Sequence, residues 1–301
     1  MDGHGKIGGK RAEPVVAGPP PYLDALGTSA GLRSFYASSE DRAALLDAVA
    51  ERVTGHRIAL LSIDIFDTAL LRGQRSELAR FRSAAERFHR TVFGTGGKSD
   101  FSIDDALLAR ITAARAAYSM NGSKSEGGDP TFSQIAKTVC TLLRRPELTR
   151  SYIESELASE IADVQVNPLL EAIRRRFPAL RTVFLTDTYL ESPQVRKIFS
   201  AAHGKTRRPA ILSSADGFGS KAAGTLFAHA ERTFGAPPAH ALHIGDNLET
   251  DYLSPKRRGW QALHVPLPAR ELAARRTSFE KIIRGDRDLP AAFRRDVAFV
   301  P

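Results

Sequence analysis

Residues 57–64, Arg-Ile-Ala-Leu-Leu-Ser-Ile-Asp, form a short apolar run that ends in an acid, and this run decides the fold. The chain continues Ile65-Phe66-Asp67-Thr68, which places a second acid and a hydroxyl directly after the run. Short continuous apolar runs are typical of strands buried in a parallel sheet. An acid at the end of such a strand, beside a tight turn, suits a carboxylate nucleophile next to a metal ion.

Four later stretches follow the same plan, and we predict a strand over each of residues 182–186, 209–213, 240–246 and 260–265. Between the later strands lie segments long enough for one helix each, such as 193–202 and 221–234. Strands that alternate with helices predict an α/β fold, a doubly wound, parallel, Rossmann-like sheet. Ligands of such sheets bind beyond the carboxyl ends of the strands. The residues at those ends are polar, namely Asp64, Thr186, Ser213 and Asp246.

The stretch between residues 69 and 180 is too long for one crossover, and its apolar spacing is helical. We predict helices over residues 76–93, 102–119, 132–143 and 148–162. A further helix is predicted to begin at Asn167-Pro168. We interpret about residues 72–165 as an inserted all-helical domain, and the open alternative is a longer helical layer packed on the sheet. The predicted divisions are a mobile, basic, Gly/Pro-rich tail and lead-in over 1–40, a core domain over 41–71 and 166–301, and the inserted helical domain over 72–165.

Composition excludes a small disulfide-stabilised protein, a transmembrane protein and a wholly disordered chain. The 301 residues are 42% hydrophobic and 26% charged, as in ordinary globular proteins. The one cysteine, Cys140, allows no intrachain disulfide, which suits a reducing compartment, and we expect a cytoplasmic protein without a membrane span or signal peptide. Lys and Arg number 43 against 34 Asp and Glu, but they are scattered in pairs, so nucleic acid is not the expected partner. The oligomeric state is left open.

The other strand ends carry further groups for binding an anion or a cation. The strand that ends at Thr186 presents a hydroxyl and backbone N–H groups to an oxyanion. Lys221 is predicted at the start of a helix, where its ammonium can neutralise anionic oxygens. Asp246 and Asp251 lie five residues apart across a turn that Gly245 makes possible, and together they suit a Mg²⁺ site with oxygen ligands.

Taken in order, these motifs resemble the haloacid dehalogenase superfamily. An acid-ended strand, a Thr-ended strand, a lysine and Gly-Asp-Asn with a later Asp span about residues 57–265, and the insertion looks like that superfamily's helical cap. The wording of residues 64–68, 186–190 and 245–247 looks most like a bacterial branch that is often joined to glycosyltransferases.

The resemblance implies an aspartyl-phosphate mechanism. Asp64 would attack phosphorus, and Thr186 would bind the transferring group. Lys221 would balance the charge between the transferring group and Asp64. Mg²⁺ is the implied cofactor. Its implied ligands are Asp64, the backbone carbonyl of Phe66, Asp246 and Asp251. The candidate substrate-binding residues are Thr68, Asp187 and Tyr189.

One position departs from the family pattern. Phosphatases of this superfamily usually carry a second Asp two residues after the nucleophile, as general acid and then base, and here that residue is Phe66. General acid–base catalysis is typically worth about 10²–10⁴-fold in rate. Either Asp67 or a cap residue acts as the catalytic acid, or the leaving group needs no proton. A purely structural Asp67 that caps the turn is the open alternative.

Three hypotheses about function follow. The leading one is a Mg²⁺-dependent phosphohydrolase or phosphotransferase that acts on a small, anionic, phosphorylated metabolite. The second is a catalytically weakened binding module with the same fold, because Phe66 replaces the usual acid. The third is a metal-independent dehalogenase, since a halide leaves without protonation.

Overall fold

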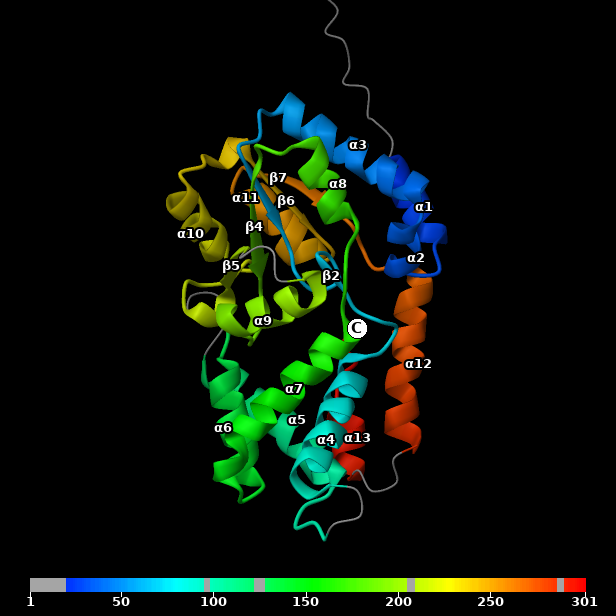
Figure 1. Ribbon diagram of the computed structural model, residues 1–301, viewed down its shortest axis with the longest axis vertical. Helices are drawn as coiled ribbons and strands as arrows, with labels where there is room; N and C mark the ends of the chain where they lie inside the picture. Colours follow the sequence, from blue (N-terminus) through cyan, green and yellow to red (C-terminus); the bar gives the residue numbers. More distant parts are fainter. Residues whose placement is uncertain (1–19, 95–97, 122–127, 205–208, 286–289) are drawn as a thin grey trace, which may run out of the picture.

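A five-stranded parallel sheet forms the centre of the computed structural model, which describes residues 20–94, 98–121, 128–204, 209–285 and 290–301 (Figure 1). The strand order is β5-β4-β1-β6-β7, and every adjacent pair is parallel. The strands are β1 (Leu60–Ile63), β4 (Arg181–Thr186), β5 (Ala210–Ser213), β6 (Ala241–Gly245) and β7 (Gln261–His264). All five predicted strands form, and the α/β, doubly wound, parallel fold is confirmed.

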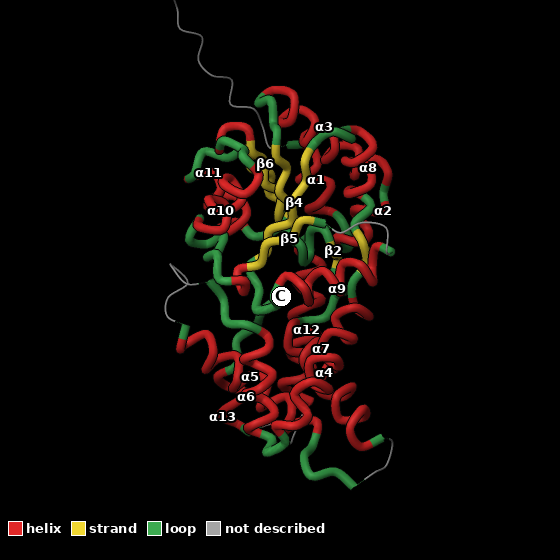
Figure 2. The backbone as a smooth tube through the Cα atoms, turned by 60° about the vertical axis from the view of Figure 1, so that its left-hand side comes forward, coloured by secondary structure: helices red, strands yellow, loops and turns green. Residues whose placement is uncertain are grey.

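Helices cover both faces of the sheet because side chains on successive strand residues point to opposite sides. Phe184 and Ile211 belong to a core that includes α9 (Ser192–His203), α8 (Leu169–Arg176) and α3 (Ser39–Gly55). Val183 and Leu185 pack instead with α10 (Thr225–Phe234). The short α11 (Ser254–Arg257) contacts β7. Figure 2 shows the sheet between these helices. Burial on both faces explains why the strands read as continuous apolar runs.

The predicted helical stretch folds into four helices beyond the carboxyl edge of the sheet (Figures 1 and 2). They are α4 (Glu77–Phe93), α5 (Ile103–Met120), α6 (Phe132–Leu142) and α7 (Thr149–Asp163). The side chains of Ser76, Ser102 and Thr131 accept hydrogen bonds at the starts of the first three. The helical pattern is confirmed, whereas the division of the chain into a core and a cap stays a prediction.

A two-stranded antiparallel sheet that was not predicted joins the two ends of the helical insertion. It pairs β2 (Leu70–Leu71) with β3 (Gln165–Val166). Strands of two residues are too short to show an alternating pattern in the sequence. The pairing brings the chain that enters α4 next to the chain that leaves α7.

Part of the predicted lead-in is folded. α1 (Pro21–Thr28) and α2 (Leu32–Ala37) bury Tyr22, Leu26 and Phe35 in the main core, while the earlier part of the predicted tail lies outside the described residues. Two of the residues that suggested a tail lie at helix boundaries, because Pro21 opens α1 and Gly31 precedes α2.

The C-terminal region also departs from the sequence analysis. α12 (Ala269–Gly285) packs against α4, so this part of the predicted core domain contacts the helical insertion (Figure 1). The short α13 (Ala291–Asp296) follows it. The helix predicted from residue 221 begins instead at Thr225, because Gly224 before it adopts a left-handed conformation. Among the described residues, no helix combines the length and the apolar character needed to cross a membrane.

Asn167 ties the start of α8 to the turn after β1. Its Oδ1 accepts a hydrogen bond from the Leu169 N–H (2.8 Å), and its Nδ2 donates one to the Thr68 carbonyl (2.7 Å). Because this buried side chain satisfies groups on two segments, we predict that Asn167→Ala lowers the free energy of unfolding by about 2–3 kcal/mol. Urea denaturation measures the loss. The control is Ser102→Ala, an exposed helix cap worth about 1 kcal/mol. An equal loss in both variants would contradict the bridging role.

Candidate active site

The polar strand ends meet at one cavity of about 390 Å³ at the carboxyl edge of the sheet. Asp64, Thr186, Lys221, Asp246 and Asp251 all line it, as the sequence predicted. A larger cavity of about 550 Å³ lies between α8, α9 and the β4–β5 edge, but none of the predicted site residues reaches it. The predicted catalytic and metal-binding side chains named above therefore lie around the smaller cavity.

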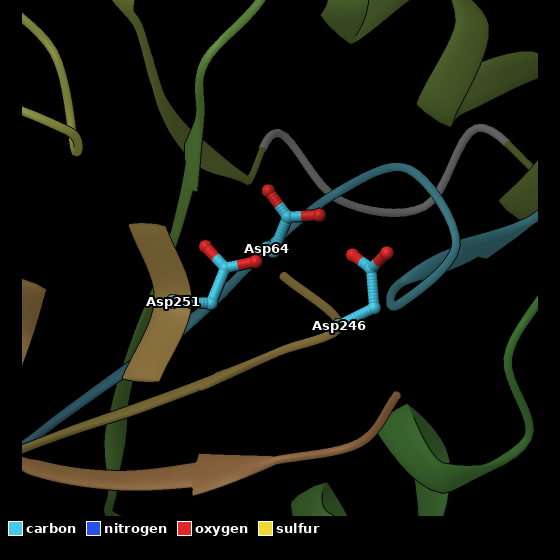
Figure 3. A group of neighbouring side chains, drawn as sticks. All are labelled: Asp64, Asp246 and Asp251. Atoms are coloured by element: carbon cyan, nitrogen blue, oxygen red, sulfur yellow. The ribbon is translucent and has the colours of Figure 1, made fainter. Parts of the chain in front are cut away.

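Three carboxylates form the centre of the site. Asp64, Asp246 and Asp251 each offer an oxygen, and these oxygens lie within 4.8 Å of one another (Figure 3). Asp64 follows β1, Asp246 follows β6, and Asp251 lies in the π-helical turn over residues 248–253. Carboxylate oxygens are the ligands that Mg²⁺ prefers. Phe66, whose carbonyl is a predicted ligand, lines the same cavity.

Lys221 supplies the only ammonium that pairs with this cluster among the described residues. Its Nζ donates to Asp64 Oδ1 and, at 2.5 Å, to Asp251 Oδ1. The side chain is almost fully buried. One ammonium against three carboxylates leaves an excess of two negative charges when all three are ionised. A divalent cation at this point balances that excess, so the residues present fit Mg²⁺.

The pKa values report the same imbalance. Burial raises the pKa of Asp64 to about 7, although Lys221 opposes the rise. Burial, together with the charges of Asp64 and Asp251, raises the pKa of Asp246 well above its usual value. Burial opposes ionisation of Asp251, but Lys221 and His243 together outweigh it, so the pKa of Asp251 is lowered. Asp251 and Asp64 raise the pKa of Lys221 in return. The cluster thus holds Asp251 ionised and penalises charge on the other two acids.

Asp251 is held in place by three groups besides Lys221. The Nε2 of His243 lies 3.1 Å from Asp251 Oδ1, and its Nδ1 lies 2.8 Å from the Ser62 hydroxyl. The backbone N–H of Asn247 donates to Asp251 Oδ2 at 3.0 Å. Gly245 lies directly against this side chain. Burial lowers the pKa of His243, so the ring is neutral and orients the carboxylate without cancelling its charge.

The other predicted site residues on the β4 side have different surroundings. Thr186 ends β4 and is buried against the cavity. Asp187 also lines it, but its carboxylate accepts the backbone N–H groups of Lys221 (2.7 Å) and Ala222 (3.1 Å). Tyr189 lines the cavity and donates its hydroxyl hydrogen to Glu156 Oε1 at 2.9 Å. Asp187 therefore fixes the loop that carries Lys221, and its role in binding substrate stays a prediction.

Thr68 does not belong to the cavity. It is 1% exposed and is absent from the cavity lining, and its backbone carbonyl accepts the Asn167 side chain. The cavity lining thus gives no support to its predicted role in binding substrate, which stays a prediction. The hydroxyl oxygen of Thr68 is buried in the tight turn after β1.

Asp67 lines the cavity but is engaged by an arginine. Its two carboxylate oxygens accept hydrogen bonds from Arg275 of α12 at 2.7 and 2.8 Å. Burial opposes ionisation, but Arg275 outweighs it, so the pKa of Asp67 is lowered. A carboxylate that is held ionised has no proton to give. The geometry favours the structural interpretation of Asp67 over its predicted role as the catalytic acid.

Several cavity residues were missed by the sequence analysis. Arg72, Arg80 and Glu160 also line the cavity, and the Arg72 guanidinium lies 3.9 Å from the centre of the Phe66 ring. Arg72 pairs with Glu160 at 3.1 Å. Glu77 and Tyr118 complete this polar wall. These residues belong to or precede helices, and no local motif indicates which helix face meets the sheet.

No protein-family model matches the chain, and no curated protein does. Similar solved structures include a 2-haloacid dehalogenase from Pseudomonas syringae, at 17% identity and a TM-score of 0.46 over 69% of this chain and 86% of that one. A second is a haloacid dehalogenase (HAD) family enzyme from Bacteroides thetaiotaomicron, at 9% identity and a TM-score of 0.47 over 69% of this chain and 93% of that one. A third is the L-2-haloacid dehalogenase from Xanthobacter autotrophicus, at 14% identity and a TM-score of 0.41 over 69% of this chain and 77% of that one.

These are haloacid dehalogenase superfamily enzymes. The superfamily of these three structures is the one that the motifs of this chain resemble. Likenesses at these identities and scores assign neither a reaction nor a substrate to the chain. The particular bacterial branch stays a prediction.

Gly245 makes room for Asp251, and this gives a test of the cluster. A Cβ at residue 245 would lie 2.4 Å from Cγ of Asp251, so Gly245→Ala must displace that carboxylate. We predict that the variant binds Mg²⁺ at least about tenfold more weakly, as measured by isothermal titration calorimetry. Gly55→Ala is the control, because a Cβ there meets no atom within 4 Å. Equal Mg²⁺ affinity in the parent and Gly245→Ala would contradict the assignment of Asp251.

Proposed function

We propose that the chain is a Mg²⁺-dependent phosphohydrolase or phosphotransferase that acts through an aspartyl-phosphate. The observation that carries the proposal is the meeting of Asp64, Thr186, Lys221, Asp246 and Asp251 at one small cavity. In phosphoryl transfer, the protein contributes mainly the orientation of the nucleophile and the neutralisation of charge. This set of groups supplies both.

The residues divide the work by their chemistry. Asp64 attacks phosphorus, while the Thr186 hydroxyl and the Lys221 ammonium bind the oxygens of the transferring group. Asp64, Asp246, Asp251 and the Phe66 carbonyl would hold Mg²⁺, which supplies positive charge to the phosphoryl oxygens when bound. The positioning by His243, described above, keeps the Asp251 carboxylate turned toward this centre.

The substrate is a small phosphorylated metabolite with a good leaving group. A cavity of about 390 Å³ lies near the lower end of the usual range for small-ligand sites. Phe66 has no proton to donate, and Asp67 is held ionised by Arg275. An aryl or acyl phosphate fits this site, because its leaving group departs as a stable anion.

Phosphate release tests the proposal directly. With 4-nitrophenyl phosphate, we predict turnover that requires Mg²⁺ and falls at least about 10³-fold in Asp64→Asn, because the amide is not a nucleophile. The control is Asp47→Asn, an acid on the exposed surface of α3. Turnover in the presence of EDTA, or an Asp64→Asn variant as active as the parent, would contradict the proposal.

The leaving group tests the consequence of Phe66. Across a series of aryl and alkyl phosphates, we predict that kcat/KM falls steeply as the pKa of the leaving group rises. Loss of a general acid removes about 10²–10⁴-fold of rate, and this loss is felt most by poor leaving groups. Steady-state kinetics of phenyl and alkyl phosphates provides the measurement. A series with no dependence on the leaving group would show that another residue protonates it.

Two other functions remain as outcomes of the same experiments. Phe66 also favours a dehalogenase, because halide needs no proton, and chloride release from a 2-chloro acid with EDTA present would establish it. The excess negative charge of the carboxylate cluster argues for a metal-dependent reaction instead. A binding module would show Mg²⁺ binding without turnover, and without a thermal shift in beryllofluoride.

A further inference from the structure

Asp67 occupies the strained position of the turn that follows the nucleophile. Its φ of +62° lies in the left-handed region, which side chains other than Gly, Asn and Asp rarely adopt. Its N–H donates to the Leu70 carbonyl at 2.8 Å, and the Leu70 N–H donates back to the Ile65 carbonyl at 2.7 Å. The Ala69 N–H donates to the carbonyl of Asp64 itself at 3.1 Å. The conformation at Asp67 thus sets the path of the chain from Asp64 to Leu70.

Arg275 holds this position from a helix more than 200 residues further along the chain. Its guanidinium is fully buried, and two of its N–H groups grip the two oxygens of Asp67. Asp67 Oδ1 also accepts the backbone N–H of Arg72 at 3.3 Å. A paired, planar grip of this kind fixes orientation as well as distance.

Arg275 is anchored on its other side. It pairs at 2.5 Å with Glu271, one turn earlier on α12, and Glu271 Oε2 accepts the Leu32 N–H at the start of α2 at 2.6 Å. Glu271 is buried as well. The grip on Asp67 is therefore attached to two helices that lie outside every motif of the sequence.

We propose that Arg275 is a positioning residue of the active site, which acts through Asp67 to hold the Asp64 carboxylate and the Phe66 carbonyl in register for the cation. This rests on the proposed function for its catalytic consequence, but the geometry of the turn can be tested without turnover. The pairing with Arg275 explains why residue 67 is an aspartate, although glycine would adopt this left-handed conformation at a lower conformational free energy. It also gives α12 a part in the reaction.

The experiment compares Arg275→Met, Asp67→Asn and their double variant in the full chain. Arg258→Met is the control, because Arg258 pairs with Glu231 through two similar hydrogen bonds at 3.0 and 2.7 Å and does not line the cavity. The measurements are amide hydrogen exchange over residues 64–70, Mg²⁺ affinity by calorimetry, and kcat and KM with 4-nitrophenyl phosphate. All are made well below the thermal unfolding midpoint of each variant.

We expect Arg275→Met to speed exchange at Asp67, Ala69 and Leu70 at least about tenfold, and to leave exchange in β6 unchanged. We expect it to weaken Mg²⁺ binding and to lower kcat by about tenfold each, with little change in KM. The double variant should be no worse than the worse single variant, because both changes remove one interaction. Arg258→Met should lower only the unfolding midpoint.

The proposal is overturned if Arg275→Met leaves exchange over 64–70 as in the parent, or if its effects match those of Arg258→Met. Additive effects in the double variant would also overturn it, since Arg275 would then act by another route. If the parent itself neither binds Mg²⁺ nor turns over substrate, the proposed function fails, and hydrogen exchange alone still decides whether Arg275 holds the turn.

Discussion

Three closely spaced carboxylates, two of which pair with one buried ammonium, are the constraint on which the rest of the site depends. Like charges within a few ångströms repel strongly in a protein interior, and Lys221 compensates only part of that repulsion. A fold keeps such a cluster only where something else stabilises it. In the proposed function, a divalent cation would supply the positive charge that the carboxylates and a phosphoryl group both need.

The fold builds this cluster from simple parts. Parallel strands place their carboxyl ends at one edge, so Asp64, Thr186 and Asp246 meet there although they are far apart in the sequence. The insertion then closes the edge with a polar wall from α4, α5 and α7 (Figure 1). In the proposed reaction, the strand ends would supply the reacting groups, and the helices would supply part of the wall around the substrate.

The sequence predicted what depends on local pattern. The apolar runs and their polar ends located the strands, and the spacing from Gly245 to Asp251 indicated a cation site. Lys221 lines the cavity although α10 begins four residues later. Its backbone lies in a loop, and the Asp187 carboxylate holds that loop in place. Arg72 and Arg275 could not be predicted, since their roles arise from the packing of helices against a distant turn.

The most direct test is a crystal structure of the full chain with Mg²⁺ and beryllofluoride, an analogue of a phosphoryl group bound to a carboxylate. The account predicts beryllium on a carboxylate oxygen of Asp64, its fluorides against Thr186 and Lys221, and the cation between Asp64 and Asp246. A structure in which the analogue and the cation bind elsewhere, and Asp64 stays unmodified, would contradict it.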